Sequence, residues 1–237
     1  MAKSKDAFKG FTPEAFEFLS KLSENNNKTW FDAHRGVYDA AIVAPALLFV
    51  ESMALALKAI APSVKSEPRI GGSLFRIHRD TRFSADKSPY KAHVGIRFRD
   101  ADTASSSKCT GPLFYVEFDA TRLRLGIGVK EFGSNTLQSY RRAVARKEAA
   151  DEITGIIRRA HRGGHAVLGD VLARIPTSYS SQADNELLRR KGLFIVRETG
   201  LPNEIYRPDF VAFCMRSFEP QAPLFDRLRR IALGRAQ

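Results

Sequence analysis

The stretch from Arg69 to Lys91, RIGGSLFRIHRDTRFSADKSPYK, concentrates side chains that bind anions. Its basic residues are opposed by only two carboxylates, Asp80 and Asp86. Guanidinium groups bind phosphate or carboxylate oxygens through two parallel hydrogen bonds, so several of them around one hollow neutralise two or three anionic oxygens. We therefore expect a pocket for a phosphorylated or carboxylated ligand. The candidate ligand-binding residues are Arg76, His78, Arg79, Asp80, Arg82, Asp86, Lys87, Tyr90, Lys91, Tyr115 and Glu117.

The two carboxylates of this stretch admit a second interpretation. Asp80 and Asp86 either orient the arginines around a ligand or form structural ion pairs that pin an exposed loop, with Arg79, Arg82 and Lys87 as partners. Unpaired buried charges cost several kcal/mol, so some internal pairing is expected in both cases. The sequence leaves the two interpretations open.

A metal-dependent phosphoesterase is a further alternative. Asp80, Asp86 and Glu117 would hold a divalent cation for phosphoryl chemistry, and His78 would act as the acid or base. No spacing specifies such a site, and the chain has no nucleophile elbow, Walker loop or dinucleotide fingerprint. We therefore assign no catalytic residue and expect neither a metal nor another cofactor, and the sequence does not decide whether the protein is an enzyme.

Composition and charge limit the class of protein. The 237 residues include 38 Lys and Arg against 26 Asp and Glu, which gives a net charge of +12 and a sequence pI of about 10.0. Such a chain attracts polyanions, so a nucleic-acid partner held by basic helix faces is an alternative to a small anionic ligand. Those faces carry Arg141, Arg142, Arg146, Lys147, Arg158, Arg159 and Arg162, and a solvated surface is their other interpretation.

Neither cysteine usage nor hydropathy points outside the cytoplasm. Cys109 and Cys214 are far apart, so no disulfide framework or cysteine zinc site is expected. The longest apolar run, Ala40 to Val50, is interrupted by Pro45 and is too short to cross a membrane. We expect a cytoplasmic protein with no membrane partner, and the oligomeric state stays open.

Helix signals dominate both ends of the chain. A polar lead-in over residues 1–9 is expected to be flexible, and Thr12-Pro13-Glu14 then starts a helix with a hydroxyl cap and a proline in its first turn. Asn27 is suited to cap a second helix, and Pro45 starts a third. Apolar periodicity predicts further helices over 135–147, 148–162, 208–218 and 223–233.

Strand patterns occupy the middle of the chain. Alternating residues predict strands over 74–78 and 93–99, and a hairpin joins strands over 113–118 and 123–129. These strands share one apolar face, while Arg, Glu, Tyr and Gly side chains mark the other. Glycines on the polar face leave room for a ligand or a crossing segment. We predict a single α+β domain over residues 10–237, with a mostly antiparallel sheet and helices packed mainly on one face.

The chain also resembles a known family over nearly its whole length, from about Phe11 to the final helices. The matching segments are Asn26-Asn27-x-x-Trp30-Phe31, Arg76-Ile77-x-Arg79-Asp80-Thr81-Arg82-Phe83-Ser84, Asp86-Lys87-x-Pro89-Tyr90-Lys91, Glu117, Gly126-x-Gly128, Pro176-x-x-Tyr179 and Leu187 to Gly192. These segments are similar to domain-of-unknown-function family 2461, whose pattern has His-Pro where this chain has Glu131-Phe132. The resemblance implies a family of uncharacterised proteins and supplies no activity.

Overall fold

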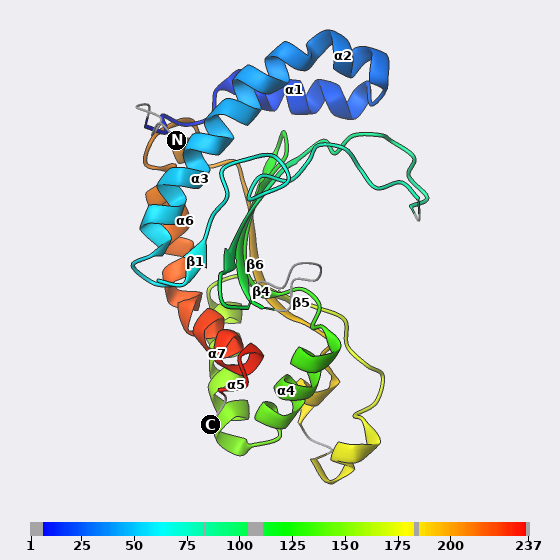
Figure 1. Ribbon diagram of the computed structural model, residues 1–237, viewed down its shortest axis with the longest axis vertical. Helices are drawn as coiled ribbons and strands as arrows, with labels where there is room; N and C mark the ends of the chain where they lie inside the picture. Colours follow the sequence, from blue (N-terminus) through cyan, green and yellow to red (C-terminus); the bar gives the residue numbers. More distant parts are fainter. Residues whose placement is uncertain (1–6, 83, 104–110, 183–184, 236–237) are drawn as a thin grey trace.

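The computed structural model of the protein describes residues 7–82, 84–103, 111–182 and 185–235. Within these residues the chain forms an α+β domain in which one antiparallel sheet carries helices mainly against one face (Figure 1). Cys214 is buried, whereas Cys109 lies outside the described residues. The predicted fold class is therefore confirmed.

The sheet has six strands in the described residues, in the order β1-β2-β3-β4-β6-β5, and every neighbouring pair is antiparallel. Asp119 closes the predicted hairpin, because its side chain accepts hydrogen bonds from the backbone N–H groups of Thr121 (2.8 Å) and Arg122 (2.9 Å). The strands are β1 (Val64–Lys65), β2 (Val94–Asp100), β3 (Leu113–Phe118), β4 (Arg122–Val129), β5 (Ala166–Leu168) and β6 (Leu193–Gly200).

Two N-terminal helices form a hairpin at one end of the sheet (Figure 1). Helix α1 spans Pro13–Glu24, and α2 spans Lys28–Val37. The predicted cap of α2 is confirmed, since the Asn27 side chain accepts a hydrogen bond from the backbone N–H of Trp30 at 3.0 Å. Phe8, which lies within the expected lead-in, is 4% exposed and packs edge-on against the Phe49 ring.

The second and third predicted helices are one continuous helix of 30 residues, Lys28–Leu57. A π-helical turn, η1 (Tyr38–Val43), leads directly into α3 (Ala44–Leu57). This wide turn shifts the hydrogen-bond register, so Pro45, which has no N–H group, falls in the first turn of α3 where no donor is needed.

This helix is long and apolar enough to cross a membrane by length and composition alone. The expectation that Pro45 interrupts the longest apolar run is therefore wrong, because the helix continues through this proline. Core helices of soluble proteins meet the same criterion, and α3 buries Ala46, Phe49, Val50, Met53 and Leu57 in the protein interior.

The second half of the chain closes the fold as its periodicity predicts. Helices α6 and α7 contact β4 on the apolar face of the sheet, and α4 and α5 lie at the end opposite the N-terminal hairpin (Figure 1). Gly163 follows the last residue of α5, Arg162, where the predicted helix over 148–162 also ends. The elements are α4 (Ser134–Val144), α5 (Lys147–Arg162), η2 (Thr177–Gln182), η3 (Glu186–Arg189), η4 (Asn203–Tyr206), α6 (Phe210–Phe218), η5 (Glu219–Gln221) and α7 (Ala222–Ala232).

The prediction of a strand over residues 74–78 is wrong. Leu74 forms an isolated antiparallel bridge with Ile96, and the backbone N–H of Phe75 donates to the Gly95 carbonyl at 2.9 Å, but no regular strand follows. The chain leaves β2 after this point, so the period of two is lost. Leu74 and Ile77 are both buried, whereas the Phe75 side chain lies beside Gly95 and Tyr115 on the polar side of the sheet.

Candidate functional site

Residues 78–82 and 84–91, termed the arm from here on, project from the body of the protein (Figure 1). Backbone hydrogen bonds close its base: Arg79 N–H donates to the Pro89 carbonyl at 2.9 Å, and Lys91 N–H donates to the Ile77 carbonyl at 2.8 Å. These bonds bring residues 77–79 and 89–91 together, and the described residues between them lead away from the sheet.

The charges farther along the arm are paired with one another. The Arg82 guanidinium donates to both carboxylate oxygens of Asp80, at 2.9 and 2.7 Å, and these bonds lower the pKa of Asp80 to about 2. Arg79 forms an ion pair with Asp86, and the Lys87 ammonium donates to the Thr81 carbonyl at 3.0 Å. The structural pairing that the sequence allowed for the two aspartates is therefore present.

Three cations gather where the arm meets the sheet, and Arg76, Arg79 and Lys91 are termed the cationic cluster. The Lys91 ammonium donates a hydrogen bond to the Arg76 carbonyl at 2.9 Å. Burial lowers the pKa of Lys91, and the charges of Arg76 and Arg79 lower it further. Within the described part of the chain, Arg76 and Lys91 form no ion pair, and Asp86 is the one carboxylate paired with the cluster.

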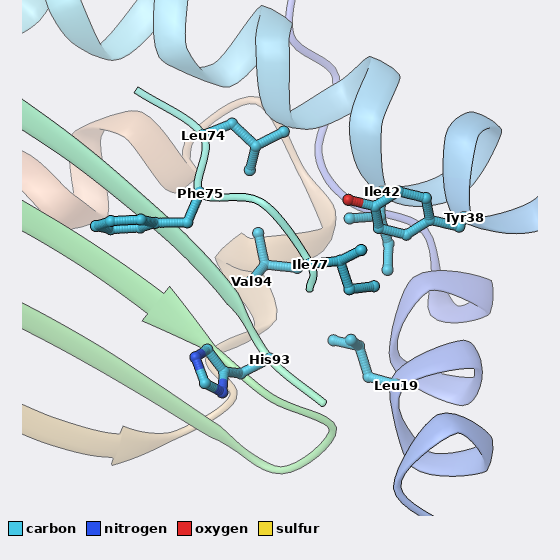
Figure 2. A pocket seen from close by; sticks show the side chains of 8 residues that line it. All are labelled: Leu19, Tyr38, Ile42, Leu74, Phe75, Ile77, His93 and Val94. Carbon is cyan, nitrogen blue, oxygen red and sulfur yellow. The ribbon is translucent and has the colours of Figure 1, made fainter. Parts of the chain in front are cut away.

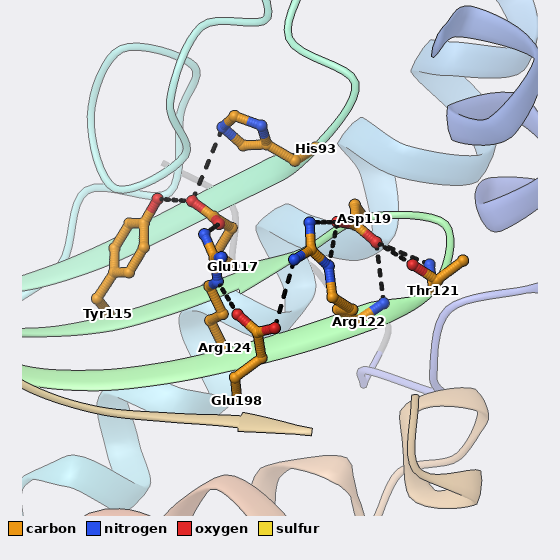
Figure 3. A network of polar contacts seen from close by, with 8 residues as sticks. All are labelled: His93, Tyr115, Glu117, Asp119, Thr121, Arg122, Arg124 and Glu198. Atoms are coloured by element: carbon orange, nitrogen blue, oxygen red, sulfur yellow. Dashed lines mark hydrogen bonds and ion pairs between the residues drawn. The ribbon is translucent and has the colours of Figure 1, made fainter. Parts of the chain in front are cut away.

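A row of alternating charges crosses the polar face of the sheet (Figure 3). Glu117 of β3 is directly opposite Arg124 of β4, which is opposite Glu198 of β6. Arg124 contacts Glu117 at 3.2 Å and Glu198 at 2.5 Å, and the Tyr115 hydroxyl donates to Glu117 at 2.6 Å. Such cross-strand neighbours are close because the strand register sets their spacing.

His93 lies close enough to the charge row and to the cationic cluster for charges of both to act on its ring. Its Nε2 atom lies 3.8 Å from a carboxylate oxygen of Glu117 (Figure 3). Burial lowers the pKa of His93, and the nearby charges of Lys91 and Arg79 lower it further, while the negative charge of Glu117 opposes them. His93 therefore lies within the electrostatic reach of both groups.

Asn26 fixes the arm to the N-terminal hairpin. Its side chain donates to the Tyr90 carbonyl at 2.9 Å and accepts from the Tyr90 N–H at 3.0 Å. The Tyr90 ring is 4% exposed and stacks on the Phe31 ring with centroids 4.2 Å apart. These contacts join two segments that the family resemblance rests on, and they place Tyr90 as a support for the neighbouring Lys91.

A small cavity with about 230 Å³ of empty space, part of it open to solvent, lies between the N-terminal helices and the sheet (Figure 2). Its lining is apolar apart from His93 and the Tyr38 hydroxyl. Burial raises the pKa of Tyr38 to about 12, so this hydroxyl stays protonated at neutral pH. The lining residues are Leu19, Tyr38, Ile42, Leu74, Phe75, Ile77, His93 and Val94.

The three carboxylates considered for a metal site do not form one in the described residues. Asp80 and Asp86 are engaged by arginines of the arm, and Glu117 is engaged by Tyr115 and Arg124 on the sheet. No group of three or more His, Cys, Asp or Glu side chains in the described part of the chain is arranged to hold a metal ion.

The structure thus divides the sequence-predicted site residues. Arg76, Arg79 and Lys91 are brought together, with Arg79 and Lys91 in electrostatic reach of His93 beside Glu117, while Asp80, Arg82, Asp86 and Lys87 are held by contacts within the arm. His78 is exposed at the base of the arm, paired with Tyr90 by a backbone bridge. The basic residues of α4 and α5 lie far from the arm, at the other end of the molecule (Figure 1).

Sequence reasoning missed four residues of this region as site residues. Alternation along β2 and β4 places His93, Arg97 and Arg124 on the polar face, so the pattern contained a signal for them. Asn26 carries no such signal, because its partner Tyr90 is 64 residues away and only the folded chain joins them.

A family model described as "Conserved hypothetical protein (DUF2461)" matches residues 14–226. The match covers the N-terminal hairpin, the arm, the whole sheet and the start of α7. A comparison with curated proteins finds no match.

Proposed function

The chain belongs to the conserved hypothetical protein family DUF2461, and we propose that it binds a phosphorylated or carboxylated ligand at the cationic cluster. The carrying observation is that the Lys91 ammonium donates to the Arg76 carbonyl at 2.9 Å and lies within the electrostatic reach of the Arg76 and Arg79 charges, while Asp86 is the one carboxylate among the described residues that pairs with the three cations. Like charges held together repel, and an anion among them replaces that repulsion by attraction.

The surroundings of the cluster support a ligand of this kind. The backbone hydrogen bonds at the base of the arm and the Asn26 contacts fix the backbone that carries Arg79 and Lys91, so little backbone order is lost when an anion binds. His93 lies next to the cluster and offers a ring nitrogen to a ligand oxygen. The arm tip contributes less, because Asp80 neutralises Arg82 there.

Titration of the purified protein with inorganic phosphate, followed by calorimetry at constant ionic strength, tests this function. Arg76→Gln and Lys91→Gln are expected to weaken phosphate binding by about tenfold or more each, since a hydrogen bond to a charged group contributes about 1.5–3 kcal/mol. Arg142→Gln is the matched control: it removes the same unit of charge from an exposed position of α4, at the other end of the molecule.

Equal weakening by all three substitutions would attribute binding to net charge and would refute the site. Absence of phosphate binding to the unaltered protein would refute the function itself.

A further inference from the structure

Three aromatic rings form a row across the polar face of the sheet, beginning beside the cationic cluster. The centroid of Phe75 lies 6.0 Å from that of Tyr115, which lies 6.4 Å from that of Phe194. Both contacts are edge-to-face, with interplanar angles of 71° and 66°. The rings come from three separate places in the chain: the segment before the arm, β3 and β6.

Glycines create the space for this row. A Cβ atom at Gly95 would lie 2.9 Å from the Phe75 ring and 2.9 Å from the Tyr115 hydroxyl. A Cβ atom at Gly126 would lie 2.3 Å from the Phe194 ring. The glycines of the polar face, expected from the sequence to admit a ligand or a crossing segment, thus seat aromatic rings close to the backbone.

The two rings nearest the cluster keep part of their surface in solvent. Phe75 and Tyr115 are half-buried, whereas Phe194 is 8% exposed. Lys91 of the cluster lies over the Phe75 ring at 5.5 Å from its centroid, and the Arg97 guanidinium lies over the same ring at 4.6 Å. A partly exposed aromatic surface and a site for an anion are therefore contiguous.

We propose that the ligand is a nucleotide, with its phosphate at the cationic cluster and its base against Phe75 and Tyr115. This inference rests on the proposed function and specifies its ligand class. Aromatic side chains and arginine planes are the surfaces on which nucleobases stack, and neighbouring cations hold the phosphate. The same unit occurs free and within a single-stranded nucleic acid, which a chain of net charge +12 attracts.

Calorimetric titration of the intact protein with inorganic phosphate, ribose 5-phosphate, adenosine and adenosine monophosphate tests the ligand class. Stacking of one base strengthens binding by about five- to 150-fold, so adenosine monophosphate is expected to bind at least about fivefold more tightly than ribose 5-phosphate. Equal affinity of these two would overturn the inference while leaving the proposed function intact. Adenosine binding as tightly as adenosine monophosphate would also overturn it, and failure of both phosphates without a base would overturn the proposed function.

Leucine substitutions of the two aromatic residues test where the base of the nucleotide binds. Phe75→Leu and Tyr115→Leu are expected to remove the advantage of adenosine monophosphate over ribose 5-phosphate, with ribose 5-phosphate affinity changed less than twofold. Tyr115→Phe is the control, because it keeps the ring and loses only the hydroxyl that donates to Glu117. An unchanged advantage in both leucine variants would overturn the placement, and the comparison of ligands on the unaltered protein stands if a variant does not fold.

A short oligothymidylate without a terminal phosphate distinguishes the two sources of the nucleotide. Tighter binding of the oligonucleotide than of thymidine monophosphate, lost in Phe75→Leu, supports a single strand as the source. Tighter binding of thymidine monophosphate than of the oligonucleotide supports a free nucleotide as the ligand. No binding of either nucleotide form would overturn the inference.

Discussion

Substitution of Asn26 by alanine removes contacts that hold the base of the arm without changing any charge in the arm. The change removes two hydrogen bonds to the Tyr90 backbone, at 2.9 and 3.0 Å. Each contributes about 1 kcal/mol, and a buried peptide group left without a partner costs about 1–3 kcal/mol. We therefore expect Asn26→Ala to lower the free energy of unfolding by about 2–4 kcal/mol.

Differential scanning calorimetry measures this loss as a fall in Tm. For a protein of this length, 1 kcal/mol corresponds to about 2–4 °C, so the expected fall is roughly 4–16 °C. Asn27→Ala is the matched control in the neighbouring position. It removes the cap of α2, which costs about 1 kcal/mol and roughly 2–4 °C, and leaves the Tyr90 backbone untouched.

The two variants differ further in what they do to the arm. Asn26→Ala is expected to speed amide hydrogen exchange at Arg79 and Lys91, whose N–H groups close the base of the arm, and to weaken phosphate binding. Asn27→Ala is expected to leave both unchanged. If the two variants destabilise the protein equally and exchange at Arg79 and Lys91 is the same in both, the role assigned to Asn26 is refuted.

Three further predictions follow from separate parts of the structure. Gly128 has a φ of +131° and its Cβ would lie 2.2 Å from the Leu193 carbonyl oxygen, so Gly128→Ala should cost at least about 2 kcal/mol in urea unfolding. A Cβ atom at Gly36 would meet no atom within 4 Å, so Gly36→Ala should not lower the free energy of unfolding and should raise it by up to about 1 kcal/mol. Similar losses of stability in Gly128→Ala and Gly36→Ala would contradict the steric account. Arg82 holds the pKa of Asp80 at about 2, below the ordinary aspartate value of 3.8, so the stabilisation from this pair is present above pH 4 and is lost as pH falls toward 2. The NMR titration midpoint of the Asp80 carboxyl carbon should lie near 2 and rise in Arg82→Gln; a midpoint near 4 in the unaltered protein counts against the pair. Magnesium and manganese ions should leave Tm unchanged, because the carboxylates of Asp80, Asp86 and Glu117 are engaged by other side chains. A metal-dependent rise in Tm that Asp80→Ala abolishes would restore the phosphoesterase alternative.

The sequence by itself determined most of the helices and the strands β2, β3 and β4, because their signals are local. Alternation over 93–99 and 113–129 marks strands, and Asn27 marks a helix start, since each depends on neighbours within a few residues. The same patterns separated an apolar sheet face from a polar one. They failed at residues 74–78, where the chain pairs with β2 at one point and then turns into the arm.

Tertiary structure decided which of the basic residues come together and which are paired with a carboxylate. Four residues of the basic stretch carry the same positive charge and look alike in the sequence: Arg76, Arg79, Arg82 and Lys91. In the folded chain Arg82 is paired with Asp80, whereas Arg76 and Lys91 meet at the base of the arm. The outcome depends on the backbone path between residues 78 and 91 and on the Asn26 contacts from a distant helix hairpin. Ion pairing depends on distance in space, which residue type and spacing along the chain do not specify.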